Sequence, residues 1–209
     1  MQSISKQLLA RIRGFGKGSA FSSKDFVDLA DRNTVDQILS RLCSRGVIRR
    51  ITSGIYDFPR ENPELGGRLS PDIQQVARAL ARKNGIRIQP SPAAAANLLG
   101  LSTQVPAKVE YLTDGRTRTI RVAGRDLRLK HVAPRELKAG SDIGVLVTQA
   151  LRYIGHEQVG STEVEYLKRK LSDKDKRHLR RDARYMEDWI WKTIQQITED
   201  VKEKKSHHG

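Results

Sequence analysis

The stretch from residue 21 to residue 58 constrains the fold more than any other part of the chain, because it combines two helix starts with a two-stranded hairpin. Ser22 is followed three residues later by Asp25, which is the spacing of a capping box. Phe21, just before the cap, is placed to pack on Phe26. A short helix is therefore expected to begin after Ser22.

The second helix of this stretch begins at Asn33, which opens another cap-and-acid pattern, and is expected to end at Gly46. Its buried stripe comprises Val35, Ile38, Leu39 and Leu42. Residues 47–51 then have the pattern of a strand, 52–54 of a tight turn, and 55–58 of a returning strand. Helices followed by such a hairpin are the layout of a winged helix-turn-helix domain, in which the hairpin is the wing.

The rest of the chain is expected to form a second domain, so the fold class is α+β. A first helix after Ser3 completes a winged helix-turn-helix domain in residues 1–60. Residues 61–70 are polar and contain Pro63 and a Gly pair, which indicates a linker. Residues 71–209 are predicted to be a mixed α/β C-terminal domain.

Two features of that C-terminal domain are specific enough to predict. Short apolar-alternating runs at 109–112, 119–122 and 127–132 are separated by turn residues, which predicts a small antiparallel sheet in the form of a three-stranded meander. Apolar residues then recur at steps of three and four from Leu179 to Val201. This spacing predicts one long C-terminal helix of six or more turns.

The charge of the chain points to a polyanionic partner. The 209 residues include 39 Lys and Arg against 24 Asp and Glu, a net charge of +15. Residues 1–60 hold 11 basic and 5 acidic side chains (+6), residues 61–140 hold 14 and 7 (+7), and residues 141–209 hold 14 and 12 (+2). Since the excess lies in the first two thirds, nucleic acid is the first partner to consider.

The single cysteine, Cys43, excludes an intramolecular disulfide and a cysteine-rich zinc site, which fits a cytoplasmic setting. The N-terminus lacks an apolar run of signal-peptide length, and no stretch is apolar enough to span a membrane. We therefore expect a cytoplasmic protein with no membrane partner.

The outer face of the second helix is the candidate for reading bases. Asn33, Gln37 and Arg41 lie opposite the buried stripe, and side chains of these types recognise adenine and guanine edges in the major groove. We predict that these three contact bases. The alternative is an ordinary solvated helix face on which Asn33 only caps.

Further residues around this helix are predicted to contact DNA phosphates, which would position the protein without reading sequence. These residues are Lys17, Ser22, Lys24, Arg45, Arg49 and Arg50. For Arg49 and Arg50 the alternative is a strand edge that its charges keep soluble.

A second basic surface is predicted on one face of the meander. It comprises Arg116, Arg118, Arg121, Arg125, Arg128 and Lys130. No phosphate-binding glycine loop, metal-ligand spacing or nucleophile motif accompanies it. We therefore expect no enzyme activity, no cofactor and no metal, and two adjacent histidines at the C-terminus are given no role.

With these residues in view, the chain resembles the AbiEi family of antitoxins from bacterial type IV toxin–antitoxin systems. The resemblance is carried by residues 20–26, by the helix through Leu39–Ile48, by the Gly54-Ile55-Tyr56 wing, and by a following mixed α/β domain. It implies binding to operator inverted repeats, repression of the protein's own operon, and opposition to a nucleotidyltransferase-like toxin. One departure is Ser53, which stands where a basic wing residue is expected.

The resulting hypothesis is an antitoxin that is also a sequence-specific, double-stranded-DNA-binding repressor. The alternative is a protein that neutralises a toxin by direct contact through its basic C-terminal domain, with DNA binding secondary. An RNA-processing or nucleotide-using enzyme is the least supported hypothesis.

Overall fold

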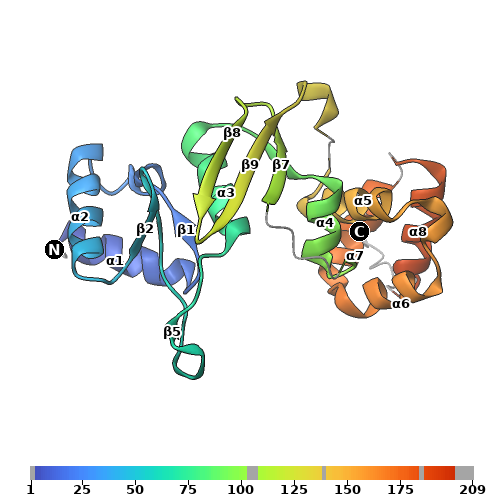
Figure 1. Cartoon of the computed structure of the whole chain (residues 1–209), viewed down its shortest axis with the longest axis horizontal. Helices are drawn as coiled ribbons and strands as arrows, with labels where there is room; N and C mark the ends of the chain where they lie inside the picture. The colour runs from blue at the N-terminus through green and yellow to red at the C-terminus, as the bar shows by residue number, and fades with distance from the viewer. Residues whose placement is uncertain (1–2, 103–107, 138–139, 184–185, 201–209) are drawn as a thin grey trace, which may run out of the picture. The chain divides into compact units, whose positions relative to one another are not determined.

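The chain forms two compact units, each built from two separate segments. The structure is a computed structural model and describes residues 3–102, 108–137, 140–183 and 186–200. The first unit comprises Met1–Ile88 and Ala107–Val132, and the second comprises Gln89–Pro106 and Ala133–Gly209. Helices and strands are mixed along the chain, so the α+β class is confirmed at this level (Figure 1).

The N-terminal part of the first unit packs helices against a small antiparallel sheet. Its elements are α1 (Ile4–Phe15), β1 (Ala20–Phe21), η1 (Ser23–Phe26), α2 (Arg32–Ser44), β2 (Arg49–Thr52) and β3 (Ile55–Asp57). The sheet has the order β1-β3-β2. The β2–β3 hairpin is therefore extended by β1, which comes before η1 and α2 in the chain. The core contains Leu8, Ile12, Phe21, Phe26, Val35, Ile38, Leu39, Leu42, Ile48 and Tyr56. The predicted stripe of α2 is therefore buried, as expected.

The capping box at Ser22 is confirmed, although the helix it starts is a single 3-10 turn, η1. The Ser22 N–H donates to Asp25 Oδ2 over 2.8 Å, and the rings of Phe21 and Phe26 meet edge to face with centroids 5.6 Å apart.

The start of α2 differs from the prediction by two residues. Asp31, rather than Asn33, is the N-cap, and its carboxylate accepts the Thr34 N–H at 3.1 Å and the Thr34 hydroxyl at 2.6 Å. The carboxylate of Asp31 is the stronger acceptor for the positive end of the helix. Asn33 is consequently inside the first turn, with its side chain exposed. The predicted end is correct, since α2 stops just before Gly46, whose φ is +70°.

Residues 61–70 form a hairpin where the sequence predicts a linker. β4 (Glu61–Asn62) pairs antiparallel with β5 (Gly67–Arg68), and η2 (Pro63–Leu65) joins them. The Asn62 side chain accepts the Glu64 N–H at 3.0 Å, and two glycines of positive φ reverse the chain. The polar composition of residues 61–70 therefore marks a tight reversal of the chain. Arg68 of this hairpin donates to the Gly46 carbonyl at the end of α2.

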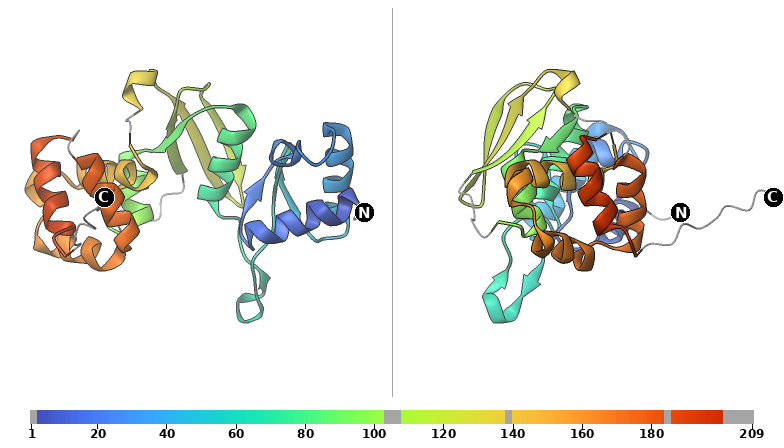
Figure 2. Two further views of the ribbon diagram at one scale, coloured as in Figure 1. Left: turned by 180° about the vertical axis from the view of Figure 1, so that it is seen from behind. Right: turned by 90° about the vertical axis from the view of Figure 1, so that its right-hand side faces the viewer.

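The remainder of the first unit is a sheet covered by α3 (Ile73–Asn84). Its strands are β6 (Ile88–Pro90), β7 (Lys108–Thr113), β8 (Arg118–Val122) and β9 (Arg125–His131), in the order β6-β7-β9-β8. Opposite views show α3 lying across one face of the sheet (Figures 1 and 2).

The predicted meander is wrong, because β7 pairs with β9 in parallel and only β8 and β9 form an antiparallel hairpin. β9 carries two fully buried leucines, Leu127 and Leu129, whereas in β8 only Val122 is buried. The polar strand β8 is therefore placed at the edge, where one side needs no apolar neighbour, and the apolar strand β9 is central.

The second unit is helical. Its elements are α4 (Pro92–Leu99), η3 (Pro134–Glu136), α5 (Asp142–Ile154), η4 (His156–Gln158), α6 (Ser161–Lys170), α7 (Asp173–Ala183) and α8 (Asp188–Ile197). Its core joins apolar residues of all five α-helices, among them Ala95, Leu151, Leu167, Leu179 and Ile194. None of the described helices is long and apolar enough to cross a membrane.

The single long C-terminal helix is a wrong prediction, because this region forms two helices, α7 and α8. Glu187 is extended and serves as the N-cap of α8, and Asp188 follows in its first turn, where acids favour a new helix start. The spacing persists across the break because Leu179 and Ile190 are both fully buried in the same core. Val201, the last residue of the predicted stripe, lies outside the described residues.

The compact units do not follow the predicted domains 1–60 and 71–209. α3 and the strands β7, β8 and β9 belong with the N-terminal helices, whereas α4, which lies between them in sequence, packs in the helical unit. The tertiary contacts of the two helices explain this division: the end of α3 hydrogen-bonds to elements of residues 1–60, while α4 buries Ala95, Ala96 and Leu99 against α5 and its neighbours.

Candidate nucleic-acid interface

The exposed face of α2 is the most specific candidate surface. Asn33, Gln37 and Arg41 follow each other at four-residue intervals, which places them in one row along the helix, and all three are exposed. Ser40 and Ser44 are exposed beside this row. The structure therefore makes the three predicted base-contact residues accessible together, on the side opposite the buried stripe; contact with bases stays a prediction.

Four of the predicted phosphate-contact residues are exposed: Lys17, Lys24, Arg45 and Arg50. Lys17 lies 3.7 Å from a carboxylate oxygen of Glu61, in the β4–β5 hairpin, so part of its charge is balanced. Arg45 immediately follows α2 and Arg50 lies on β2, so cations lie at the end of the α2 row and on the hairpin.

Ser22 and Arg49 are corrections to that prediction. Ser22 is completely buried, and its hydroxyl donates to Asp25 Oδ2 at 3.2 Å, so the side chain is not presented to a ligand. Arg49 donates to both carboxylate oxygens of Asp57, at 3.1 and 2.6 Å, and to the Leu69 carbonyl at 3.1 Å. Asp57 is 1% exposed. Arg49 is therefore the partner of a buried carboxylate, and only its neighbour Arg50 faces solvent.

The turn of the β2–β3 hairpin is held by a lysine from another element. Lys83, in the last turn of α3, donates from Nζ to the Ser53 carbonyl at 2.7 Å. Its ammonium lies against Gly54, whose φ is +67°, and a Cβ at that position would come within 2.6 Å of it. The sequence has no basic residue at the turn, but the structure brings one there from thirty residues away.

The end of α3 makes two further bonds to the N-terminal elements. Arg82 donates from Nε to Asp25 Oδ1 at 2.8 Å and from Nη2 to the Ala20 carbonyl at 2.9 Å. Asp25 thereby accepts both from the cap of η1 and from α3. Sequence reasoning missed Arg82 and Lys83; the only signal was a pair of cations in the last turn of a helix, which is also the ordinary complement of a helix dipole.

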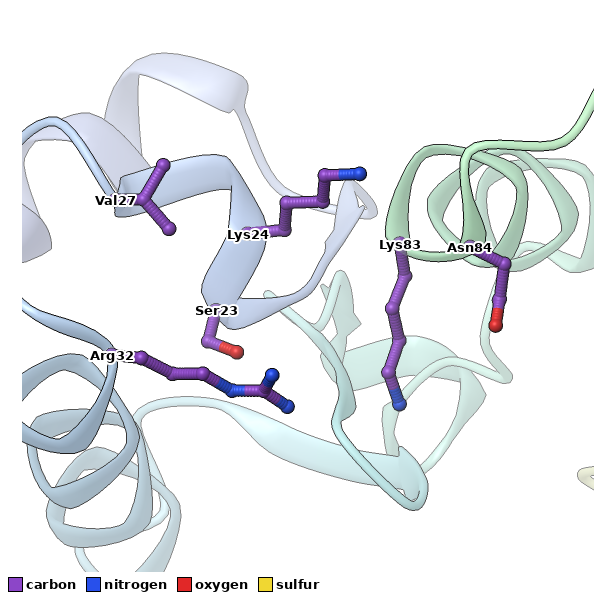
Figure 3. Close-up of a pocket in the computed structure, with 6 residues that line it drawn as sticks. All are labelled: Ser23, Lys24, Val27, Arg32, Lys83 and Asn84. Carbon is purple, nitrogen blue, oxygen red and sulfur yellow. The ribbon is translucent and has the colours of Figure 1, made fainter.

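A pocket of about 340 Å³ opens between these elements (Figure 3). It is lined by Ser23, Lys24, Val27, Arg32, Lys83 and Asn84. Lys24 and Arg32 extend from one wall toward the wall formed by the end of α3 (Figure 3). Burial, and then the positive charges of Arg32 and Arg118, lower the pKa of the Lys83 ammonium below its ordinary value. The pocket is therefore electropositive.

The predicted basic face of the sheet is divided between its two sides. Strand alternation and the β8–β9 register put Arg118 and Arg125 on the side of the buried Leu127 and Leu129. Arg121, Arg128 and Lys130 lie on the opposite side, and Arg116 lies in the loop before β8.

The outer side of that sheet also carries carboxylates that balance part of its charge. Arg121 lies 3.5 Å from Asp126, and Arg128 lies 3.6 Å from Glu110. The prediction of one strongly basic face is therefore wrong, because oppositely charged residues on neighbouring strands pair across the sheet.

Among the described residues, no group of three His, Cys, Asp or Glu side chains is arranged to hold a metal ion.

Comparison with known proteins gives a family but no function. No match was found among the curated proteins. The solved structure of the Rv2827c protein from Mycobacterium tuberculosis is similar at 15% sequence identity and a TM-score of 0.36, over 92% of this chain and 76% of that one. A TM-score of this size does not establish a common fold. A family model described as a family of unknown function, DUF6088, matches residues 7–179. Since the match covers most of the chain, the protein belongs to the DUF6088 family.

Proposed function

We propose that the protein is a sequence-specific DNA-binding repressor whose N-terminal part acts as a winged helix-turn-helix. The observation that carries the proposal is the exposed row of Asn33, Gln37 and Arg41 on α2. Each of these side chains can make paired hydrogen bonds to a base edge, and a helix fits the major groove of B-form DNA. In this proposal α2 is the recognition helix and the β2–β3 hairpin is the wing.

Cations beside α2 support the same proposal. Lys24, Arg45 and Arg50 are exposed, and a duplex with its recognition helix in the groove presents phosphates on both sides of that helix. Their role would be positioning, which makes the affinity fall with increasing salt concentration. The high net charge of +15 favours encounter with any polyanion and does not by itself select DNA sequence.

The biological setting that we propose is that of an antitoxin, on the resemblance described above. The repressor would bind inverted repeats ahead of its own operon in the cytoplasm and oppose a nucleotidyltransferase-like toxin, with no enzyme activity and no cofactor of its own. A reading frame of that toxin type next to the gene would support this setting.

Direct neutralisation of a toxin by the C-terminal part is the second candidate. The charges on the outer side of the sheet are partly paired, and residues 141–209 carry a net charge of only +2. These observations favour the α2 surface over a basic C-terminal surface. Co-purification of the neighbouring gene product with this chain, in the absence of DNA, would favour the second candidate.

Binding to promoter DNA tests the proposal. Gln37→Ala and Arg41→Ala should each cost about 1–3 kcal/mol of binding free energy on the preferred site and relax the preference at the bases they read. Arg50→Ala should weaken binding to all sequences alike and reduce the dependence of log Kd on log salt by about one. Selection from a random-sequence library followed by fluorescence anisotropy at several salt concentrations measures both effects.

Lys192→Ala is the matched control, because it removes an exposed cation from α8 in the other compact unit. Equal affinity of the unmodified protein for its selected site and for a scrambled duplex would contradict sequence-specific binding. An unchanged base preference in both α2 variants would show that the recognition surface lies elsewhere.

A further inference from the structure

Cations from four separate elements lie near one another beside the β2–β3 hairpin. Lys83 of α3 contacts the turn directly, at the Ser53 carbonyl. Arg32 of α2, Arg118 of β8 and Arg50 of β2 are each close enough to Lys83 for their charges to lower its pKa. These positions span 87 residues of sequence from Arg32 to Arg118 and meet only because α3 and the sheet fold against the N-terminal elements.

Negative charge in this region is too small to balance the cluster. Asp36 is the carboxylate that acts on Lys83, and it lies 3.6 Å from Arg32 as its i,i+4 neighbour on α2. The Arg32 side chain remains 74% exposed, so this pair leaves most of the guanidinium accessible. In the pocket of about 340 Å³, the described lining residues include three cations and no carboxylate.

The position of Lys24 also fits a ligand beside this cluster. Lys24 approaches from the opposite wall, with Nζ near the helix end at Gly85, and the described contacts give it no carboxylate partner. A multivalent oxygen anion in the pocket would accept hydrogen bonds from Lys24, Arg32 and Lys83 together.

We propose that this pocket binds a phosphate group, held by Lys24, Arg32 and Lys83. Lysine ammonium and arginine guanidinium groups are the usual ligands of phosphate oxygens. The pocket is large enough for a phosphate group with its bridging waters. The phosphate would sit between the start of α2 and the hairpin turn.

Two sources could supply this phosphate. The first is the backbone of duplex DNA, an assignment that rests on the proposed function, since the pocket adjoins the first turn of the helix that would read bases. Lys83 would then provide the basic group that the hairpin turn itself lacks. The second source is a soluble phosphate compound, which would regulate the unit without DNA in the pocket.

NMR of the full chain separates these sources. Inorganic pyrophosphate is titrated first, in the absence of DNA, while the Lys and Arg side-chain signals are followed. Signals of Lys24, Arg32 and Lys83 should shift with one common affinity, and the pKa of Lys83 should rise in the complex. Lys83→Gln should weaken pyrophosphate binding about tenfold, whereas Lys83→Arg should retain it.

Two controls keep the outcome independent of folding. Arg32→Gln removes a mostly exposed side chain and should weaken pyrophosphate binding without affecting the hairpin. Lys192→Gln lowers the net charge by the same amount in the other compact unit and should leave the affinity unchanged. Loss of binding in Lys192→Gln to the same extent as in Lys83→Gln would show general attraction to a basic protein and overturn the proposal.

The same variants are then tested with duplex DNA. If Lys83→Gln weakens DNA binding and reduces the salt dependence by about one, the pocket holds a backbone phosphate. If pyrophosphate binds in the pocket and the protein binds no DNA, the site stands with a soluble ligand and the proposed function fails. If pyrophosphate shifts none of the three side chains and Lys83→Gln and Arg32→Gln leave DNA affinity unchanged, the pocket is not a phosphate site.

Discussion

Tyr111 is a buried ionisable residue of the sheet. Its hydroxyl has no hydrogen-bond partner among the described residues. It lies in β7 opposite Leu129, and burial raises its pKa to about 12. Below pH 10 the neutral phenol is favoured in both folded and unfolded states. The desolvated hydroxyl nevertheless costs free energy, since water satisfies it in the unfolded chain.

Tyr111→Phe should therefore raise the free energy of unfolding by about 1 kcal/mol at pH 7. Between about pH 10 and pH 12 the unfolded tyrosine loses its proton while the folded one keeps it, so the folded state binds more protons and stability falls as pH rises. The variant should lack this contribution. Urea unfolding of both proteins at pH 7, 9 and 11 measures the difference, and a destabilised variant at pH 7 would show that the hydroxyl has a partner.

At the scale of single residues, the sequence predicts exposure better than partnership. Asn33, Gln37 and Arg41 are exposed as expected, because helical periodicity fixes which side of α2 is buried. The neighbours Arg49 and Arg50 look equivalent in sequence, yet only Arg49 meets the buried Asp57. That pairing depends on the register of β2 against β3, which includes an irregularity between Arg50 and Thr52. Short-range pattern does not determine such a register.

At the scale of elements, local signals predict where helices and strands occur but not which of them are adjacent. The turn at Ala123-Gly124 does form a hairpin, as expected, whereas the turn at Asp114-Gly115 does not. Asp114 accepts the Arg87 N–H at 2.8 Å and the Arg87 Nε at 3.0 Å. The Asp114 carboxylate therefore binds a residue that is distant in sequence, which a rule based on neighbouring turn residues does not predict.

The start of α5 is fixed by a residue of α7. Asp182 Oδ2 accepts the Ser141 N–H at 2.7 Å and the Ser141 hydroxyl at 2.5 Å, while Ser141 Oγ accepts the Gly144 N–H at 3.2 Å. The Ser141 cap of α5 is thus held in place by the Asp182 side chain of α7. The same contact therefore starts α5 and joins it to α7.

Asp182→Ala should lower the free energy of unfolding by about 1–2 kcal/mol, because the Ser141 N–H and hydroxyl lose their acceptor. Chemical denaturation followed by tryptophan fluorescence is a suitable measurement, since Trp189 packs against the core of this unit. Glu157→Ala, which removes an exposed carboxylate from the same unit, should change stability by less than about 0.5 kcal/mol. Equal effects of the two variants would show that the contact is not stabilising.

At the scale of the whole molecule, the chain divides into two compact units that do not coincide with contiguous halves of the sequence. The N-terminal capping box, the stripe of α2 and the hairpin are all predictable from residues close together in sequence. The assignment of α3 to the same unit is not, because it depends on Arg82 and Lys83 reaching acceptors 57 and 30 residues away.

Arg49→Ala provides a test of this division. It leaves the buried carboxylate of Asp57 without its partner and should destabilise the first unit by about 3 kcal/mol. Native-state hydrogen exchange should then accelerate in α2 and α3 together, with α5 and α8 unchanged. Arg50→Ala, one residue away and exposed, should leave exchange unchanged in both units. A uniform acceleration across all four helices would mean that the chain unfolds as one unit.

The path of the chain between the two units has a consequence for how the protein can be cut or recombined. The backbone leaves the first unit after Ile88, returns at Ala107 and leaves again after Val132. A protease that cleaves once, between Val132 and α5, produces an N-terminal fragment that still contains α4, whose alanines are buried in the other core. The two products should therefore co-elute as a nicked complex. For the same reason, exchange of one unit between homologues by a single gene crossover would split a core, and only a paired crossover would preserve both.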